Sequence, residues 1–508
     1  MLEIPRVVMT QLYDLAVIGG GINGCGIARD AAGRGHHTVL LEQGDLASAT
    51  SSNSTKLIHG GLRYLEQYEF SLVRKALIER ERLWAIAPHI SWPLRFVLPH
   101  RKGMRPALLL RLGLWLYDHL GGRHLLPATQ TRWRRSDPLF AALDPHLTLG
   151  FEYSDLWVED ARLVVLNAMS ARDHGADILT HHRVTAIYRE ESHWRIEGIH
   201  QDSSFTIRAR VLVNAAGPWA DKLSGVQDML PDGAHVRLVR GSHIVVPKLH
   251  DDPRCLILQN DDGRIVFVIP YQDGFSLIGT TDVDHHGSPA HAQASGEEIR
   301  YLCAAVNTQL RQQITPQDVV WSYSGVRPLL DDGASEAQAA TRDYKLVRWQ
   351  SEGGPVGLSV IGGKLTTYRV LAEEVMDQLA DVLIHQRGSF TADEPLPGGD
   401  FGVAGFDTLC RQFYADYPHL PRPLLTRAVR AYGTRAKVWL GRAHALDDLG
   451  HTYGADLTQA ELDYLCREEF AHSAEDIVWR RSKLGLRMSQ TEINQLQIAL
   501  DRASSATG

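Results

Sequence analysis

The 508-residue sequence lacks the features that mark several large classes of protein. Its five cysteines are scattered without CxxC spacing, which argues against a disulfide framework, an iron–sulfur cluster or a structural zinc site. No stretch approaches the roughly 20 uninterrupted apolar residues of a membrane-spanning helix, and the first residues lack the order of a secretory signal. The net charge of −7 argues against a general nucleic-acid-binding protein. We therefore expect a cytoplasmic globular protein with no metal site and no nucleic-acid partner.

The charge is unevenly distributed along the chain. Residues 83–136 contain nine Lys and Arg residues and one acidic residue, Asp118, so nine minus one gives this window a net charge of +8. The window includes the apolar segment RPALLLRLGLWLYDHL, which places Arg105 and Arg111 among leucines, with Trp115 near its end. One interpretation is a buried helix followed by a solvated basic loop. The charge bias favours the other, an interfacial segment on an anionic membrane surface, where each Lys or Arg contributes on the order of 1 kcal/mol.

The segment YDLAVIGGGINGCGIARDAAGRGHHTVLLEQGD predicts a dinucleotide-binding βαβ unit. The apolar run 15–18 precedes Gly19, Gly21 and Gly24 in G-x-G-x-x-G spacing, helical spacing follows, and a second apolar run ends in Glu42. Such glycines allow a tight turn and a close approach of the backbone to a pyrophosphate, which the helix N-terminus stabilises. Because the residue after the second run is acidic, it suits an unphosphorylated ribose, so FAD or NAD is indicated rather than NADP.

Two later segments predict further contacts with a long cofactor. RARVLVNAAGPWADKL is an apolar run that ends in a small-residue turn, and GLSVIGGKLTTYRVLAEEVMDQL combines a strand, paired glycines and an amphipathic helix. Each segment alone is typical of an ordinary strand-to-helix turn. Together they suit a flavin, which is held at both ends, and no second G-x-G-x-x-G unit provides a separate site for NAD.

The rest of the chain predicts an α/β protein with added layers. HWRIEGI, GSHIVVPKL, GRIVFVIPYQDGFSLIGTTD and DVVWSYSGVRPLL alternate as strands do and indicate an antiparallel sheet, whereas AHAQASGEE is interpreted as a loop. The tail from about residue 400 is expected to be helical, with a capping box from Thr458 to Glu461. We predict a Rossmann-type FAD-binding domain, an antiparallel substrate or cap domain that carries the basic membrane-facing segment, and a helical C-terminal domain. The FAD-binding domain is predicted to span 13–95 with about 150–235 and 320–385. The substrate or cap domain is predicted to span about 96–149 with 236–319, and the C-terminal domain about 395–508.

These motifs together resemble the aerobic, FAD-dependent and quinone-linked glycerol-3-phosphate dehydrogenases, within the wider family of D-amino-acid and sarcosine oxidases. The matching segments follow the family order from residue 14 to about 370, and the resemblance is weaker in the tail. They are DLAVIGGGINGCGIARDAAGRG, TSSNSTKLIHGGLRYLE, FEYSDLWVEDARLV, GSHIVVP, RIVFVIPY, IGTTDV, YSGVRPL, TRDY and GGKLTTYR.

The resemblance implies oxidation of sn-glycerol 3-phosphate to dihydroxyacetone phosphate, with hydride transfer from C2 to noncovalently bound FAD. It also implies ubiquinone or menaquinone as the next acceptor and peripheral attachment to the inner face of the cytoplasmic membrane, and a homodimer is consistent with it.

The resemblance further implies a set of site residues. Arg63, Arg327, Arg342 and Lys364 stand where the family gathers its substrate-binding cations, and Tyr64 accompanies them. His59, His243 and Arg63 are the expected catalytic residues, with His59 against the flavin and His243 against the substrate. Which histidine takes the hydroxyl proton stays open, as does a structural role for each. The expected cofactor-binding residues are Gly19, Gly21, Asn23, Gly24, Glu42, Thr50, Ser51, Ser52, Lys56, Leu57, His59, Gly60, Gly61, Ala216, Gly217, Gly363, Lys364, Leu365 and Thr366.

Three alternatives stay open at this point. An oxygen-reducing glycerol-3-phosphate oxidase would differ only in its electron acceptor. An amino-acid or amine oxidase of the same fold would need one arginine for a carboxylate, which the several cations fit less well. A non-catalytic flavin- or nucleotide-binding protein on a membrane would leave the Lys, Arg and His positions without a role.

Overall fold

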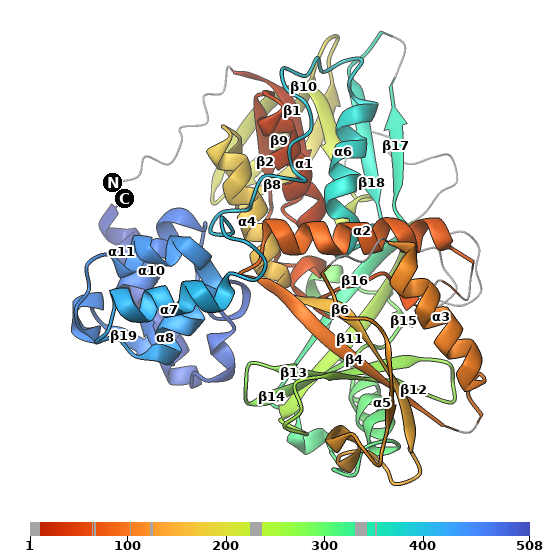
Figure 1. Cartoon of the computed structure of the whole chain (residues 1–508). Coiled ribbons are helices and arrows are strands. Elements are labelled where there is room, and N and C mark those ends of the chain that lie inside the picture. Colours follow the sequence, from red (N-terminus) through yellow and green to blue (C-terminus); the bar gives the residue numbers. More distant parts are fainter. Residues whose placement is uncertain are drawn as a thin grey trace.

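The computed structural model of the chain describes residues 11–62, 65, 68–101, 103–121, 125–223, 236–330, 343–350 and 353–507. Three of the expected site residues, Arg63, Tyr64 and Arg342, lie outside these ranges. The described residues form two large sheets, one above the other in Figure 1, with a group of helices beside them.

The first sheet contains the predicted βαβ unit, β1, α1 and β2. Its strand order is β17-β18-β10-β1-β2-β7, with β9 added to β10 and β8 to β9. The five strands from β18 to β7 are parallel, so the turns after β1, β10 and β18 meet at one edge of the sheet. The bounds are β1 Leu12–Ile18, α1 Ile22–Gly33, β2 Thr38–Leu41, β7 Asp177–Leu179, β8 His182–Arg189, β9 Trp194–His200, β10 Ser203–Asn214, β17 Lys345–Trp349 and β18 Val356–Ile361.

Both faces of this sheet are covered because successive strand residues point to opposite sides. Leu15 and Val17 of β1 pack with α1 and with α6 (Tyr368–Gln378), and α1 packs in turn against α4 (Asp160–Asp173). Ala16 and Ile18 face the layer that contains Trp194 of β9. The sheet is therefore buried on both sides, as parallel sheets usually are.

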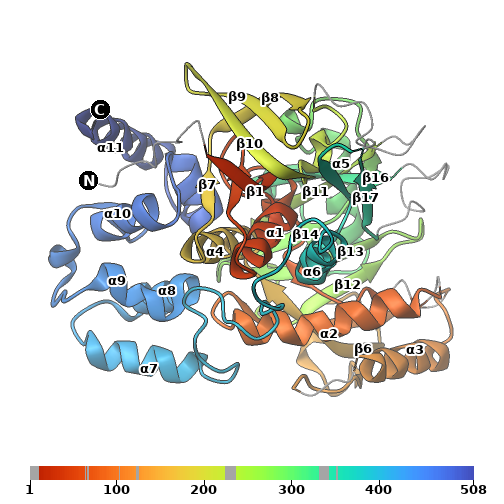
Figure 2. The same ribbon diagram turned by 90° about the horizontal axis from the view of Figure 1, so that it is seen from above.

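The second sheet is largely antiparallel and has the order β15-β11-β14-β13-β12-β4-β6-β3, with β16 on β11 and β5 on β6. Helix α5 (Gly296–Asn307) covers one face, and α2 (Phe70–Ile86) and α3 (Ala107–Leu120) cover the other. Figure 2 shows α2 and α3 along the same side of the molecule. The strand bounds are β3 Leu57–Ile58, β4 Ser91–His100, β5 Gln130–Trp133, β6 Leu149–Val158, β11 Val236–Pro247, β12 Cys255–Gln259, β13 Ile265–Tyr271, β14 Phe275–Gly279, β15 Val283–Asp284 and β16 Trp321–Leu330.

The C-terminal part is helical, as predicted, and has an apolar core of its own. The predicted capping box is only half formed: Thr458 accepts a hydrogen bond from the Glu461 amide at 3.4 Å, while the Glu461 carboxylate bonds Arg427 and Tyr432 instead of the Thr458 amide. Buried ion pairs join this part to the first sheet's layer, including Arg162 of α4 with Glu469. Its elements are α7 Phe406–Asp416, α8 Arg422–Tyr432, α9 Ala436–Leu440, β19 Thr452–Gly454, β20 Leu457–Thr458, α10 Gln459–Glu468, the π-helix η10 Asp476–Arg481 and α11 Gln490–Thr507.

The structure differs from the sequence-based expectations in three places. HWRIEGI forms β9, which belongs to the first sheet rather than to the second. Strands β3, β6 and β16 pair within the second sheet, although the predicted boundaries group their residues, apart from Leu149, with the cofactor domain. The end of AHAQASGEE is helical, because Ser295 and Glu298 form a reciprocal capping box that starts α5.

Candidate functional site

A cavity of about 500 Å³ opens where the turns of the first sheet meet the second sheet. Residues from the turns after β1, β2, β10 and β18 line it, together with loop 47–55 and part of β16. Fifteen of the predicted site residues contribute to its walls. They are Gly19, Gly21, Asn23, Glu42, Thr50, Ser51, Leu57, His59, Ala216, Gly217, Arg327, Gly363, Lys364, Leu365 and Thr366.

The turn between β1 and α1 is bare backbone that only glycine can form. Gly19 has φ +113°, and a Cβ there would lie 2.4 Å from the Ala215 carbonyl oxygen. A Cβ on Gly24 would lie 1.9 Å from the Gly19 oxygen, so Gly24 permits the close packing of helix against strand although it does not line the cavity. This cradle fits a pyrophosphate, because the N-terminus of α1 faces the same cavity.

Glu42 is held rigidly at the end of β2. Its carboxylate accepts hydrogen bonds from the Gly20 amide at 2.6 Å and from the Gly44 amide at 2.8 Å. Burial raises the pKa of Glu42, while the two amides act in the opposite direction. An oriented carboxylate beside the glycine turn is the partner that the ribose hydroxyls of FAD require.

Loop 47–55 closes one side of the cavity and is tied to both sheets. The Thr50 hydroxyl, in the 3-10 helix η1 (Thr50–Ser52), donates to the Val326 carbonyl of β16 at 2.6 Å. The Ile22 amide at the start of α1 donates to Ser51 Oγ at 3.0 Å. This loop thereby connects the start of α1 with the strand that carries Arg327.

Lys56 lies beneath this loop instead of in the cavity. Its buried Nζ is 2.8 Å from both carboxylate oxygens of Asp160 and 2.9 Å from the Ser52 carbonyl oxygen. Asp160 also accepts from the Ser54 hydroxyl at 2.7 Å. The contacts of Lys56 therefore support the loop from below, and its side chain is not among those that line the cavity.

His59 lines the cavity, and its neighbour Gly60 anchors the backbone behind it. The His59 amide donates to Thr366 Oγ1 at 3.3 Å, which joins this segment to the turn after β18. The Gly60 amide donates to the buried Tyr117 hydroxyl of α3 at 2.8 Å. A Cβ on Gly60 would lie 2.6 Å from the Leu77 side chain, so a larger residue here would require Leu77 to shift. Gly60 and Gly61 do not line the cavity.

His243 sits in β11 behind the cavity wall. Its Nε2 lies 3.0 Å from the hydroxyl of Thr55, which does line the cavity, and its ring stacks on Tyr323 at 4.8 Å. Its Nδ1 has no hydrogen-bond partner among the described residues. Burial, followed by the charges of Lys56 and Arg327, lowers the pKa of His243 well below its ordinary value, so the imidazole is neutral at pH 7.

The cavity also contains two of the predicted cations, Arg327 from β16 and Lys364 from the turn after β18. Arg327 forms an ion pair with Asp282. Sequence reasoning missed Asp282 and Thr55 as partners of the predicted residues, although both stand in the motifs IGTTDV and TSSNSTKLIHGGLRYLE. The available signal for Thr55 was its position next to Lys56 in the same motif, and for Asp282 it was a charged residue within a motif shared with the family.

The described residues contain no helix that is both long and apolar enough to cross a bilayer. Within the same ranges, no group of three or more His, Cys, Asp or Glu side chains is arranged to hold a metal ion.

Comparisons with known proteins agree with this geometry. Residues 14–369 match the family described as FAD dependent oxidoreductase, and residues 389–506 match the C-terminal domain of alpha-glycerophosphate oxidase. A glycerol-3-phosphate dehydrogenase of Pseudomonas aeruginosa is 51% identical over 96% of this chain and 95% of its own. A D-erythritol 1-phosphate dehydrogenase of Brucella abortus is 48% identical over 95% of this chain and 96% of its own.

Among solved structures, the glycerol-3-phosphate dehydrogenase of Bacillus halodurans complexed with FAD superposes with a TM-score of 0.72. It is 27% identical, and the match covers 97% of this chain and 95% of that one. The resemblance inferred from the motifs is confirmed, and so are the predicted fold class and cofactor. The chain belongs to the FAD-dependent oxidoreductase family, within the group that contains the glycerol-3-phosphate dehydrogenases.

Proposed function

We propose that this enzyme oxidises sn-glycerol 3-phosphate to dihydroxyacetone phosphate and delivers the electrons to a quinone at a membrane surface. The observation that carries the substrate assignment is that Arg327 and Lys364 line the same cavity as the glycine turn that fits the FAD pyrophosphate. A dianionic phosphate needs cations, and the planar guanidinium of arginine can bind two phosphate oxygens at once while lysine adds a point charge.

The protein's own groups also offer a route for the hydroxyl proton. When bound, FAD supplies the two-electron acceptor for the hydride from C2. The alcohol must lose its proton in the same conversion, and a neutral imidazole can accept it. His243, kept neutral by burial and 3.0 Å from Thr55, is placed to act through the Thr55 hydroxyl, and His59 lies on the cavity wall itself. Each of the two histidines is a predicted candidate for the base that takes the proton.

The substrate assignment is tested by adding substrate to the FAD-loaded enzyme without oxygen. Glycerol 3-phosphate is expected to bleach the flavin absorbance, whereas glycerol, which lacks the phosphate, is not. Because a relative that is 48% identical is named for D-erythritol 1-phosphate, that compound must be tested in parallel, and its faster reduction of the flavin would overturn the assignment. Lys364→Met is expected to raise the KM for glycerol 3-phosphate, whereas the absorbance spectrum of bound FAD should stay close to that of the wild type.

The variants His59→Gln and His243→Gln distinguish between the two candidate bases. The variant that lacks the base is expected to reduce its flavin slowly with FAD still bound. Normal turnover in both variants would rule out a histidine base.

The membrane assignment rests on α3, whose outer face is apolar. Leu108 is 80% exposed and Trp115 is 55% exposed, while Leu114 and Tyr117 on the opposite face are buried. Figure 1 shows α3 at the outer edge of the molecule. Arg105 precedes the helix and is exposed, so an apolar face and a cationic group occur together, as expected for a helix that lies in an anionic membrane surface.

Vesicles that contain anionic lipid and a quinone provide the corresponding test. Leu108→Ser/Trp115→Ser is expected to reduce vesicle binding and quinone reduction, while reduction of an artificial water-soluble dye stays normal. Ile384→Ser is the matched control, because Ile384 is 86% exposed outside α3. Unchanged vesicle binding of the α3 variant would refute the membrane assignment. Stoichiometric hydrogen peroxide formation without quinone would instead indicate an oxygen-reducing oxidase.

A further inference from the structure

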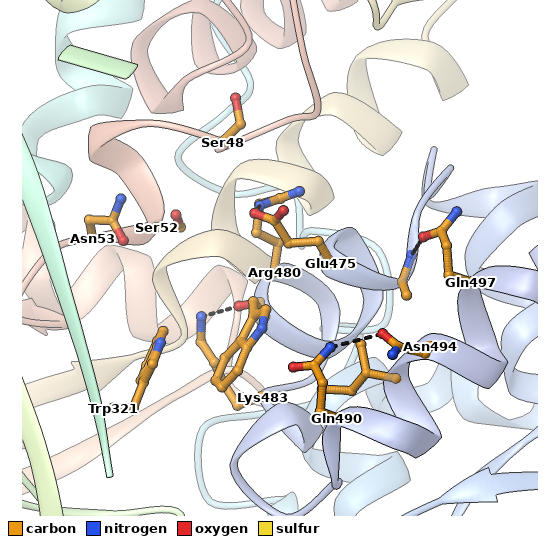
Figure 3. Close-up of a pocket in the computed structure, with 13 residues that line it drawn as sticks. Ser48, Ser52, Asn53, Trp321, Glu475, Arg480, Lys483, Gln490, Asn494 and Gln497 are labelled. Atoms are coloured by element: carbon orange, nitrogen blue, oxygen red, sulfur yellow. Dashed lines mark hydrogen bonds and ion pairs between the residues drawn. The ribbon is translucent and has the colours of Figure 1, made fainter. Parts of the chain in front are cut away.

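A second cavity of about 500 Å³ lies where the C-terminal helices meet the cofactor-binding loop. Figure 3 shows its walls, which come from loop 48–53, from Trp321 of β16 and from residues 474–497. Ser48 and Asn53 line both this cavity and the cofactor cavity. A molecule bound in the second cavity would therefore contact the same loop that closes the FAD site.

The second cavity contains a buried ammonium group that lacks a close counter-charge. Lys483 is only 5% exposed, and its Nζ donates to the Trp479 carbonyl. Among the described residues, no carboxylate oxygen lies within 4.0 Å of it. Two carboxylates lie farther away: Asp160, which is paired with Lys56 at 2.8 Å, and Glu159, which accepts a hydrogen bond from Trp157 Nε1 at 3.2 Å. Burying a cation is unfavourable unless an anion accompanies it, so the site favours an anionic ligand.

The other cation of the cavity is already neutralised. Arg480 bonds Asp45 at 2.6 Å and Glu475 at 3.0 Å, and it also forms an ion pair with Asp476. An anion that enters the cavity would therefore be drawn to Lys483 rather than to Arg480.

Two indole rings contribute much of the apolar lining of the cavity, beside Ala474 and Ile493. Trp321 and Trp479 stack with ring centroids 4.4 Å apart and an angle of 18° between their planes. Indole surfaces of this kind bind flat unsaturated groups by stacking or by edge-to-face contact. Helix α11 lines the cavity with three amide side chains, Gln490, Asn494 and Gln497, and with the apolar Ile493.

We propose that the second cavity binds a small organic acid in which a carboxylate is attached to a flat aromatic or conjugated group. The carboxylate lies against the Lys483 ammonium, and the flat group packs on the indoles. The α11 amides orient polar substituents. This site is separate from the proposed substrate site, so it extends the function beyond alcohol oxidation to the binding of a second ligand next to the flavin loop.

The proposal is tested with 4-fluorobenzoate, whose binding to the FAD-loaded enzyme is followed by fluorine NMR. Saturable binding is expected, and saturating glycerol 3-phosphate should not displace it. The neutral analogue 4-fluorobenzamide is expected to bind at least about tenfold more weakly, since it keeps the ring and lacks the charge. Displacement by glycerol 3-phosphate, or equal affinity for the amide, would overturn the proposal.

Two variants and a control attribute the binding to this cavity. Lys483→Met and Trp479→Leu are each expected to weaken 4-fluorobenzoate binding at least about tenfold while FAD content and circular dichroism stay normal. Lys437→Met is the matched control, because that lysine is more exposed and pairs with Asp416 elsewhere in the C-terminal part. Unchanged affinity in either cavity variant would refute the site.

The pH dependence gives an independent signature. Burial, and then the Lys56 charge, lower the pKa of Lys483 to about 7, while Asp160 and Glu159 raise it and Arg480 lowers it further. The cationic form needed for an anion is therefore lost as the pH rises through 7. The affinity for 4-fluorobenzoate is expected to fall between pH 6 and pH 8 in the wild type, and a flat profile would contradict the role of Lys483.

Discussion

Replacing Lys56 by methionine tests whether the lysine supports the cofactor loop or touches the cofactor. Methionine has a similar length and the same constraint at φ +61°, but it leaves the buried Asp160 carboxylate without its 2.8 Å partner. Removing one partner of a buried ion pair destabilises a protein by about 3–5 kcal/mol. The Ser52 carbonyl also loses its 2.9 Å donor, so η1 should become less well fixed and the affinity for FAD should fall together with stability.

The assay combines urea unfolding, followed by circular dichroism in the absence of FAD, with titration of FAD. A loss of about 3–5 kcal/mol of unfolding free energy without FAD is expected from the structure. Lys56→Met/Asp160→Asn is expected to lose clearly less than the sum of the two single variants, because the pair interacts directly. A Lys56→Met variant of unchanged stability with greatly weakened FAD binding would refute this reasoning and would indicate direct contact with the cofactor.

Two further predictions rest on particular contacts. Gly24→Ala is expected to abolish FAD binding because its Cβ would lie 1.9 Å from the Gly19 oxygen, whereas Gly44→Ala, with a nearest contact of 3.3 Å, should retain the flavin spectrum. Tyr117→Phe removes the 2.8 Å acceptor of the Gly60 amide and the hydroxyl that donates to the buried Asp155 carboxylate, and it is expected to cost about 1–3 kcal/mol in urea unfolding.

Burial lowers the pKa of His89 to about 3, so the unfolded chain binds more protons than the native protein between pH 6.5 and 3. Stability should therefore fall as the pH drops through this window, by at most about 1.4 kcal/mol per pH unit from this group. His89→Leu is expected to flatten that dependence, and an unchanged slope would contradict it.

Local sequence patterns were sufficient where one continuous segment contains all the residues that contact one another. The turn from β1 into α1 is such a case, because the spacing of Gly19, Gly21 and Gly24 encodes the close approaches seen in the structure. The position of Glu42 is another, since the end of β2 places it beside that turn. Both predictions depended only on residues within a single βαβ unit.

Contacts between distant segments could not be predicted in this way. Lys56 stands in a motif next to cofactor-binding residues, yet Asp160, 104 positions later, determines where its ammonium group lies. The hydrogen bond from the Gly60 amide to the Tyr117 hydroxyl is a second example. The packing of α3 on the second sheet brings together these two residues, which are 57 positions apart in the sequence. Sequence reasoning assigned such residues to the cofactor site but could not tell which side of the loop each would face.

The segment 50–60 shows why this distinction matters for function. Its outer side contributes Thr50, Ser51 and His59 to the cofactor cavity, while its other side carries the Lys56 ion pair and the Gly60 contact to α3. Because α3 is also the helix with the exposed apolar face, one hydrogen bond separates the proposed membrane contact from the backbone that positions His59. If α3 binds a membrane surface as proposed, we expect a change in α3 to reach the flavin site through Tyr117. Tyr117→Phe should then weaken any effect of vesicles on flavin reduction while leaving vesicle binding intact. Equal stimulation by vesicles in the variant and the wild type would show that the two regions act independently.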